Sequence, residues 1–250
     1  MVGGTAVGLY AFLNRDKRHG GLSPAERSHL NRTFGYAGAG LTITAVTAKI
    51  LHNAGWSYRL MTMNPWVVMG GSLALSLVTM YATISTPQEN TVLKHTSWIA
   101  FNVTQAGVLA PMFFLNPAVL SRAALYTVGV VGALAYVGAT ANETKYLYLG
   151  GPLLAGVTVV ALSSLAPLIL PVGTRGLALA ENISLYGGLA VFSAFILYDT
   201  QKVLAAARMS EMQGTKPDAV AQCIGLELDA INIFVRMATM LANNNGNRKR

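Results

Sequence analysis

The chain has 250 residues, of which 53% are hydrophobic and only 11% are charged, and its formal net charge is +8 at pH 7. Soluble domains average about 25% charged residues, so this composition excludes an ordinary soluble globule and indicates helices embedded in a lipid bilayer. The positive charge is concentrated in a few loops and at the C-terminus, with no nucleic-acid-binding motif, which argues against nucleic acid as a partner.

Apolar stretches of bilayer length recur along the chain. Residues 1–13 are apolar but too short for a full span, and we interpret residues 1–30 as a partial extra N-terminal helix followed by a basic loop. Residues 31–250 are expected to form one transmembrane domain with a seven-helix core, in which prolines mark several helix ends. The predicted fold class is therefore an all-α, polytopic transmembrane helix bundle. Its expected spans are 33–54, 65–85, 96–115, 118–140, 147–170, 182–205 and 219–242.

Small residues four positions apart allow helices to approach closely in lipid. We expect such pairs to lie at helix–helix contacts of a compact bundle. The pairs are Gly35 and Ala39, Gly151 and Ala155, and Ser184 and Gly188.

Lysine and arginine are distributed unevenly between the loops on the two sides of the predicted bundle. The side with the loops near Lys94, Lys145 and Arg208 receives ten of them and the opposite side three. The first side is therefore expected to face the cytosol or the matrix. The basic C-terminal residues 248–250 fall on either side, depending on whether the last helix crosses the membrane or re-enters.

Two aspartates interrupt otherwise apolar spans. Asp199 lies in the 182–205 span and Asp229 in the 219–242 span. A carboxylate in the hydrocarbon region is costly, so each aspartate suggests a function and a partner. The two helices are consecutive and joined by a short loop near 206–218, so they should be antiparallel and hold the carboxyl groups at similar depth. We therefore predict that Asp199 and Asp229 face each other.

The last span carries a polar stripe. Asp229, Asn232 and Arg236 follow i, i+3, i+7 spacing and share one helix face, so Asn232 and Arg236 are expected to support the aspartate site. Glu227 is turned about 200° away from Asp229 and points elsewhere. Because polar groups on two faces suit lipid poorly, the 219–242 helix should be the least lipid-exposed helix and lie at the centre of the bundle.

Close packing of the two carboxyl groups has a chemical consequence. Two carboxylates in low dielectric cannot both ionise cheaply, so the pair of Asp199 and Asp229 is expected to hold one proton near neutral pH. Loss of that proton leaves two negative charges, which favour a hard cation such as calcium bound through oxygen ligands. Protons and calcium are the expected ligands, with calcium a transported ion and no cofactor bound permanently.

Simpler roles for these polar residues stay open. Each aspartate could make only a structural bond, for example Asp229 with Arg236 or Asp199 with a loop lysine. The single cysteine, Cys223, excludes an internal disulfide and is interpreted as a small core residue. The four histidines lack ligand spacing, so no metal is assigned to them.

The segments around the aspartates resemble a known family, the Bax inhibitor (TMBIM) family. Phe195–Lys202 and Leu228–Arg236 are similar to its two hallmark segments. The likeness covers most of the chain from about residue 30 and is strongest toward the mitochondrial branch of the family. The segments that carry this closer likeness are Leu197–Val203, Ala238–Ala242, Gly246–Arg250, Arg122–Gly129 and Gly150–Leu153.

The resemblance implies a fold, an activity and a location. It implies seven helices with the last one central, plus an extra N-terminal helix in this branch. It also implies a pH-sensitive calcium leak or calcium/proton exchange through a di-aspartyl site, which by motif match is Asp199 and Asp229. The implied location is the mitochondrial inner membrane, with inner-membrane proteins as partners and roles in cristae organisation and apoptosis control. No transit peptide is visible, so another intracellular membrane stays open as the location.

Two other classes of function compete with transport. A non-transporting scaffold that organises the membrane through helix contacts is excluded by no feature of the sequence. An intramembrane aspartyl protease also uses two aspartates on neighbouring helices, and Tyr198 with Asp199 supplies its Tyr-Asp element. The second aspartate, however, lies in Gly225–Asp229, which is not a Gly-x-Gly-Asp motif, and no Pro-Ala-Leu element follows. The chain is therefore not expected to be an enzyme.

Overall fold

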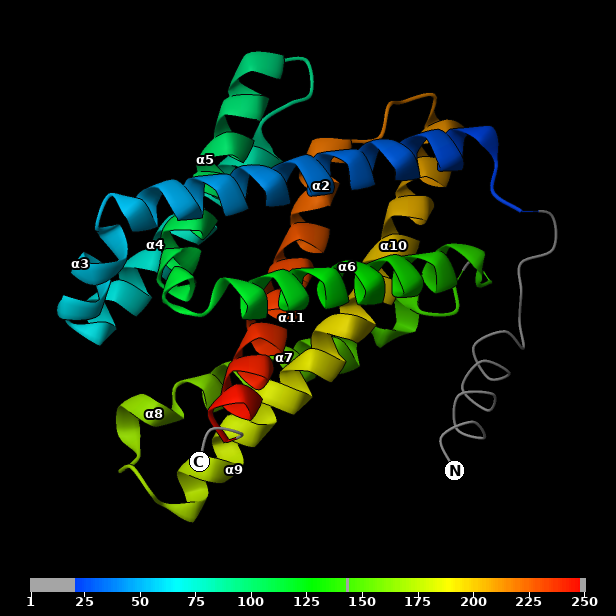
Figure 1. Cartoon of the computed structure of the whole chain (residues 1–250). Coiled ribbons are helices and arrows are strands. Elements are labelled where there is room, and N and C mark those ends of the chain that lie inside the picture. Colours follow the sequence, from blue (N-terminus) through cyan, green and yellow to red (C-terminus); the bar gives the residue numbers. More distant parts are fainter. Residues whose placement is uncertain (1–20, 143, 248–250) are drawn as a thin grey trace, which may run out of the picture. The chain divides into compact units, whose positions relative to one another are not determined.

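The computed structural model describes residues 21–142 and 144–247, which form a set of helices joined by short connections (Figure 1). The short helices are α3 (Trp56–Thr62), α8 (Ala166–Ile169) and α9 (Arg175–Asn182), and the 3-10 or π turns are η1 (Ala110–Phe114), η2 (Leu147–Leu149) and η3 (Ile183–Gly187). The long helices are α2 (Pro24–Asn53), α4 (Pro65–Ser85), α5 (Thr91–Leu109), α6 (Pro117–Thr140), α7 (Gly150–Ser164), α10 (Gly188–Gln213) and α11 (Ala219–Asn247).

Five segments are long and apolar enough to cross a bilayer, so the chain is an all-α, multi-pass membrane protein. They are Pro24–Asn53, Pro65–Ser85, Pro117–Thr140, Leu147–Ile169 and Arg175–Gln213. Helices α5 and α11 match the expected spans 96–115 and 219–242 in position, but their polar side chains keep them out of this hydropathy class. The partial helix expected near the start of the chain lies outside the described residues.

Several helix ends differ from the sequence-based expectation. Helix α2 begins at Pro24, well before the expected start at 33, because Ser23 and Glu26 form a capping box: the Ser23 amide donates to Glu26 Oε2 at 2.7 Å and the Glu26 amide to Ser23 Oγ at 3.1 Å. Helix α10 continues to Gln213, where Gly214 adopts the left-handed backbone that ends many helices. The connection to α11 is therefore residues 214–218, and the expected longer loop, 206–218, was wrong.

The described chain divides into two compact units, which we describe separately. The first unit comprises residues 21–31 and 126–217, and the second comprises residues 32–125 and 218–247. Most of α2 belongs to the second unit, as do α3, α4, α5 and α11, whereas α7, α8, α9 and α10 belong to the first.

In the first unit, Gln201 fixes α10 to the segment that follows α6. Its side chain is buried, its Oε1 accepts from the Tyr146 amide at 2.7 Å, and its Nε2 donates to the Asn142 carbonyl at 2.7 Å. One amide side chain therefore satisfies two backbone groups of a non-helical stretch, which is where a bilayer protein most needs partners for its backbone.

Replacing Gln201 with alanine should lower the free energy of unfolding by about 1–3 kcal/mol, because the buried Tyr146 amide loses the Gln201 side chain as its acceptor and the Asn142 carbonyl keeps only the Lys145 amide as a donor. Thermal or denaturant unfolding of the purified protein in detergent measures the loss. The control is Gln213→Ala, at the exposed end of the same helix, which should stay within about 0.5 kcal/mol of the wild type. Equal effects of the two substitutions would contradict the bracing role of Gln201.

In the second unit, α2 buries a stripe of small residues that recurs every three or four positions. Its members are Thr33, Ala37, Gly40, Thr44 and Ala48. This stripe lets the α2 backbone come close to its neighbours.

Two of the expected small-residue pairs were assigned to the wrong face, because Gly35 with Ala39 and Gly151 with Ala155 are exposed. The third pair fits better: Ser184 shares a 2.7 Å hydrogen bond with Ser164, and Gly188 is buried.

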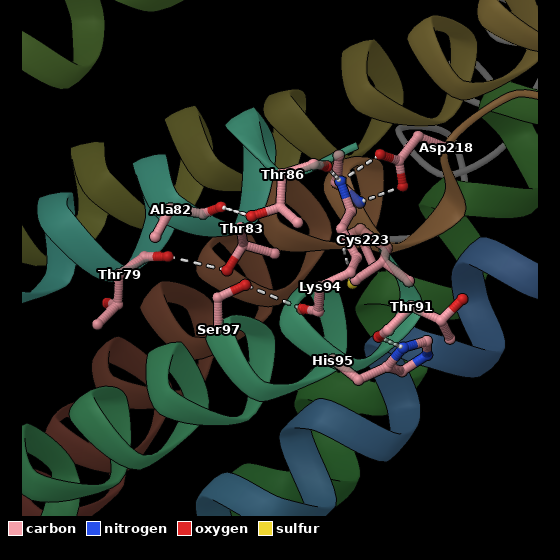
Figure 2. A network of polar contacts seen from close by, with 12 residues as sticks. Thr79, Ala82, Thr83, Thr86, Thr91, Lys94, His95, Ser97, Asp218 and Cys223 are labelled. Atoms are coloured by element: carbon pink, nitrogen blue, oxygen red, sulfur yellow. Dashed lines mark hydrogen bonds and ion pairs between the residues drawn. The ribbon is translucent and has the colours of Figure 1, made fainter. Parts of the chain in front are cut away.

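Lys94 joins three helix ends of the second unit, and Figure 2 shows its contacts. Its side chain, 2% exposed, starts in the first turns of α5, forms an ion pair with Asp218 before α11, and donates to the Thr86 carbonyl at the end of α4 at 2.8 Å. Asp218 also caps α11 by accepting from the Ala221 amide at 2.9 Å. The expectation of Lys94 as a loop cation was therefore wrong, because an aspartate and a helix-end carbonyl neutralise it inside the unit.

Candidate functional site

Asp199 lies in the first unit, on α10, and is partly buried. The residues around it on the helix are held in place. The ring of Tyr198 packs against the backbone of Gly150, Thr200 donates to the Ile196 carbonyl at 2.6 Å, and Gln201 braces the loop after α6. The helix that presents the Asp199 carboxyl is therefore anchored on both sides of it.

Asp229 lies in the second unit, on α11, and is 5% exposed. Two turns later, Arg236 donates from its Nη1 to the Asn232 side chain at 2.8 Å and to the Asn232 carbonyl at 3.0 Å. Asn232 therefore holds the guanidinium along the helix face that also carries Asp229. No residue of 219–242 is exposed, which agrees with the low lipid exposure expected for this helix. The pairing of Asp229 with Asp199, which belongs to the other unit, stays a prediction.

The second unit contains a buried polar site that the sequence reasoning missed, and Glu227 is at its centre. The Glu227 side chain is 0% exposed. Its Oε1 accepts from the indole Nε1 of Trp98 on α5 at 2.9 Å and from the thiol of Cys223, one turn earlier on α11, at 3.2 Å. The orientation expected for Glu227, away from the Asp229 face, thus directs it toward α5.

Helices α5 and α2 close the space around the Glu227 carboxyl. Asn102, one turn after Trp98, donates from Nδ2 to the Trp98 carbonyl at 3.0 Å, and its Oδ1 accepts from Thr44 Oγ1 at 2.8 Å. On α2 the neighbour is Gly40, where an added methyl group would stand 2.2 Å from Glu227 Oε1 and 2.9 Å from Asn102 Oδ1. Only glycine leaves room for the carboxyl at this point of α2.

One signal in the sequence could have indicated this site. Lys94, Trp98 and Asn102 recur every four residues on α5, and Asp218, Cys223 and Glu227 recur every four or five at the start of α11. The α5 set lies on one helix face, and Cys223 and Glu227 share a face of α11, whereas Asp218 lies just before that helix begins. Matching the two sets requires knowing that α5 and α11 are neighbours, although they are about 120 residues apart. Among the described residues, no group of three or more His, Cys, Asp or Glu side chains could hold a metal ion.

Comparisons with known proteins cover the same residues. The family model described as "Inhibitor of apoptosis-promoting Bax1" matches residues 26–246. Growth hormone-inducible transmembrane protein of Rattus norvegicus is 31% identical over 261 residues, which cover 100% of this chain and 75% of the relative. Bax inhibitor 1 of Mus musculus is 28% identical over 239 residues, with 92% and 91% of the two chains covered. No solved structure shows a significant match.

Proposed function

Because the chain belongs to the Bax inhibitor (TMBIM) family, whose members are multi-pass membrane proteins linked to apoptosis regulation and calcium handling, we propose that it conducts calcium across its membrane under the control of pH. It acts either as a calcium leak channel or as a calcium/proton exchanger. The proposed working site is the pair of Asp199 and Asp229.

The observation that carries this proposal is a carboxyl group on each of two consecutive long helices, the first of which belongs to a segment long and apolar enough to cross a bilayer. Asp199 belongs to the 39-residue apolar segment Arg175–Gln213, and Asp229 is buried on α11. An ionisable group at such depth is expensive, and it is most often part of an ion or proton pathway. Asn232 and Arg236 continue the polar face of α11 beyond Asp229, and Asn232 accepts a hydrogen bond from the Arg236 guanidinium.

The mechanism follows from the charge of the pair. With one proton shared, the two carboxyl groups carry a single negative charge and hold each other. Loss of the proton leaves two charges that repel each other or bind a calcium ion through their oxygens. A rise in pH on one side of the membrane therefore favours opening or calcium entry into the site. The proposal includes a central position of α11 within a seven-helix core.

The proposed location is the mitochondrial inner membrane. The likeness to rat growth hormone-inducible transmembrane protein over the whole of this chain supports this assignment. The helices are embedded in a lipid bilayer. We further propose that the chain has inner-membrane proteins as partners, which would link it to cristae organisation or apoptosis control.

Asp199→Asn and Asp229→Asn should each change calcium flux strongly and abolish its dependence on pH, because a single remaining carboxyl group has no partner with which to share a proton. The measurement is calcium and proton flux into liposomes that contain the purified protein, at several pH values. If the protein is an exchanger, the variants should transport less calcium than the wild type. If it is a leak channel that the carboxyl pair keeps closed, the variants should conduct more. The control is Glu211→Gln, at the exposed end of α10, which should behave as the wild type.

Thermal stability measured on the same samples separates transport from structure. If the aspartates only made structural bonds, instability would dominate, because a buried partner would be left unpaired. Unchanged flux and unchanged pH response in both folded variants would overturn the transport proposal and favour a scaffold.

A further inference from the structure

A short helix, α3, lies at the end of the second unit where α2 stops and α4 begins (Figure 1). Its seven residues are too few to cross a bilayer, whereas the segments before and after it are long enough. Gly55 has a φ of 81° and turns the chain from α2 into α3, and Asn64 caps α4 by accepting from the Trp66 amide at 2.9 Å. Helix α3 therefore connects two spans at one surface of the membrane.

One side of α3 is fixed to the rest of the unit. Trp56 donates from its indole Nε1 to the Gly107 carbonyl of α5 at 3.2 Å. Ser57 is buried and shares a 3.0 Å hydrogen bond with Nδ1 of His52 on α2. The His52 ring in turn contacts Phe114 of η1, with 4.8 Å between the ring centroids. These contacts hold α3 in one orientation against the ends of α2 and α5.

The exposed side chains at this end of the unit are largely aromatic or apolar. Tyr58 and Met61 on α3, Trp66 in the first turn of α4 and Phe114 of η1 are all exposed. Indole and phenol rings are enriched at the boundary between hydrocarbon and water, because each combines an apolar ring with a polar group. A helix that exposes such residues favours a lipid surface over water.

Two cations accompany these rings. Lys49 on α2 and Arg59 on α3 are both exposed. The Lys49 ammonium lies 5.3 Å from the centroid of the Phe113 ring, a cation–π contact that holds it at this end without cancelling its charge. Within the described part of the chain, neither Lys49 nor Arg59 forms an ion pair. Both positive charges are therefore available to an anion from outside the chain.

The second unit offers these two cations no carboxylate at this end. The only acidic residue of positions 27–142 is Glu89, which follows the far end of α4, roughly 31 Å along that helix from its start. Asp218 lies at the same far end, where it meets Lys94 beside the Thr86 carbonyl. Glu227 and Asp229 are buried in the first half of α11. The charge at the α3 end is therefore purely positive within its own unit.

We propose that this end of the unit binds the headgroups of anionic phospholipids while α3 lies in the membrane–water interface. The binding surface, here called the α3 surface, consists of Lys49, Tyr58, Arg59, Met61 and Trp66. The Arg59 guanidinium presents paired N–H donors that match phosphate oxygens, and the Lys49 ammonium adds a compact positive charge. Tyr58, Met61 and Trp66 provide apolar contact for the glycerol backbone and the upper acyl chains.

Charge complementarity selects the class of lipid. A zwitterionic headgroup carries its own cation, which the two basic side chains repel, whereas an anionic phospholipid offers its phosphate without a balancing charge. A soluble acidic partner would satisfy Lys49 and Arg59 but would leave the exposed rings of α3 and α4 in water. A lipid satisfies both parts of the surface at once, because its phosphate lies directly above its apolar chains.

Tryptophan quenching by brominated phospholipids tests the proposal on the purified full chain in liposomes. Trp56 and Trp66 are exposed at this end, whereas Trp98, the third tryptophan, is 5% exposed and out of reach of the lipid. The same fraction of brominated lipid is supplied as phosphatidylglycerol in one sample and as phosphatidylcholine in the other. Brominated phosphatidylglycerol should quench more strongly at low salt, and salt should weaken this preference. Equal quenching by the two lipids at low salt would overturn the proposal.

Substitution of the cations locates the preference on the protein. Lys49→Gln and Arg59→Gln should each weaken the relative binding of phosphatidylglycerol about fivefold, the factor that corresponds to roughly 1 kcal/mol per basic residue near an anionic surface. The double variant should lose the preference, whereas Lys49→Arg should keep it. The matched control is Arg32→Gln, an exposed cation about 25 Å from Lys49 along α2, which should quench as the wild type. A double variant that keeps the preference, or an equal loss in Arg32→Gln, would contradict the assignment.

Inorganic phosphate distinguishes a lipid site from a site for a soluble anion. Added at constant ionic strength, it should leave the preference for phosphatidylglycerol in place, because the apolar part of the α3 surface holds only the lipid. If phosphate removes the preference, the surface binds a soluble anion and the lipid proposal fails. The quenching requires neither Asp199 nor Asp229, so a failure of the transport proposal and a failure of this one are told apart by separate measurements.

Discussion

Asp218→Asn should lower the free energy of unfolding by about 3–5 kcal/mol, the usual cost when one partner of a buried ion pair is removed. Lys94 is 1% exposed, and without the Asp218 carboxylate its ammonium group keeps the Thr86 carbonyl as its only described acceptor. Asparagine is as good a helix cap as aspartate, so this change preserves the hydrogen bond to the Ala221 amide and isolates the loss of charge. Unfolding in detergent, followed by tryptophan fluorescence, measures the effect.

Lys94→Met supplies the decisive comparison. It removes the buried charge and keeps a side chain of similar length, while Asp218, whose side chain is 23% exposed, retains contact with solvent. Lys94→Met alone should therefore cost less than Asp218→Asn, and Asp218→Asn should cost little once Lys94→Met is present. Glu89→Gln, in the exposed loop before α5, is the control for a change of charge alone. An undiminished loss from Asp218→Asn in the methionine background would contradict this account.

Gly40→Ala should destabilise the protein by about 1–3 kcal/mol, because it forces atoms into a filled space. The new methyl group would stand 2.2 Å from Glu227 Oε1 and 2.6 Å from its Cδ. The Glu227 side chain cannot simply swing away, since Trp98 and Cys223 hold the same oxygen. The substitution should therefore break these hydrogen bonds as well as push α2 outward. Thermal unfolding measures the loss.

Gly38→Ala on the same helix is the matched control. No atom lies within 4 Å of the methyl group that it adds, so alanine brings only its better helix propensity and should stabilise the protein by roughly 0.5–1 kcal/mol. The two substitutions, two residues apart on α2, are expected to have opposite signs. If both stabilise the protein, the close approach of α2 to Glu227 does not exist in solution.

Much of the helix order could be predicted from the sequence, because bilayer length and proline placement are local signals. Helices α4 and α6 begin at Pro65 and Pro117, as the punctuation indicated. Helix ends controlled by side-chain caps were harder to predict. The capping box of Ser23 and Glu26 lengthens α2 before its apolar region, and polar residues extend α10 to Gln213. Hydropathy alone does not detect either extension.

The site was predictable only in part, because helical periodicity gives the direction of a side chain but not what it meets. The sequence correctly separated Glu227 from the face of Asp229, Asn232 and Arg236, yet it could not identify α5 as the neighbour in that direction. For the same reason the sequence analysis placed Lys94 among the loop cations, because periodicity could not identify Asp218 as its partner. Local composition does not indicate where a polar helix such as α5 lies, because the partners of its polar side chains are far away in the chain.

During synthesis, the residues of α5 that make these distant contacts emerge from the ribosome well before their partners. Lys94 and Trp98 meet their partners Asp218 and Glu227 across 124 and 129 residues of chain. At a translation rate of about 5–20 residues per second, α5 leaves the ribosome roughly 6–25 s before those partners exist. The first unit is built largely from the continuous stretch 126–217, whereas the second consists of residues 32–125 and the last helix. The nascent second unit must therefore keep a lysine and an indole N–H hydrated or shielded until α11 is released, and every chain that stops before residue 218 leaves both groups without these partners.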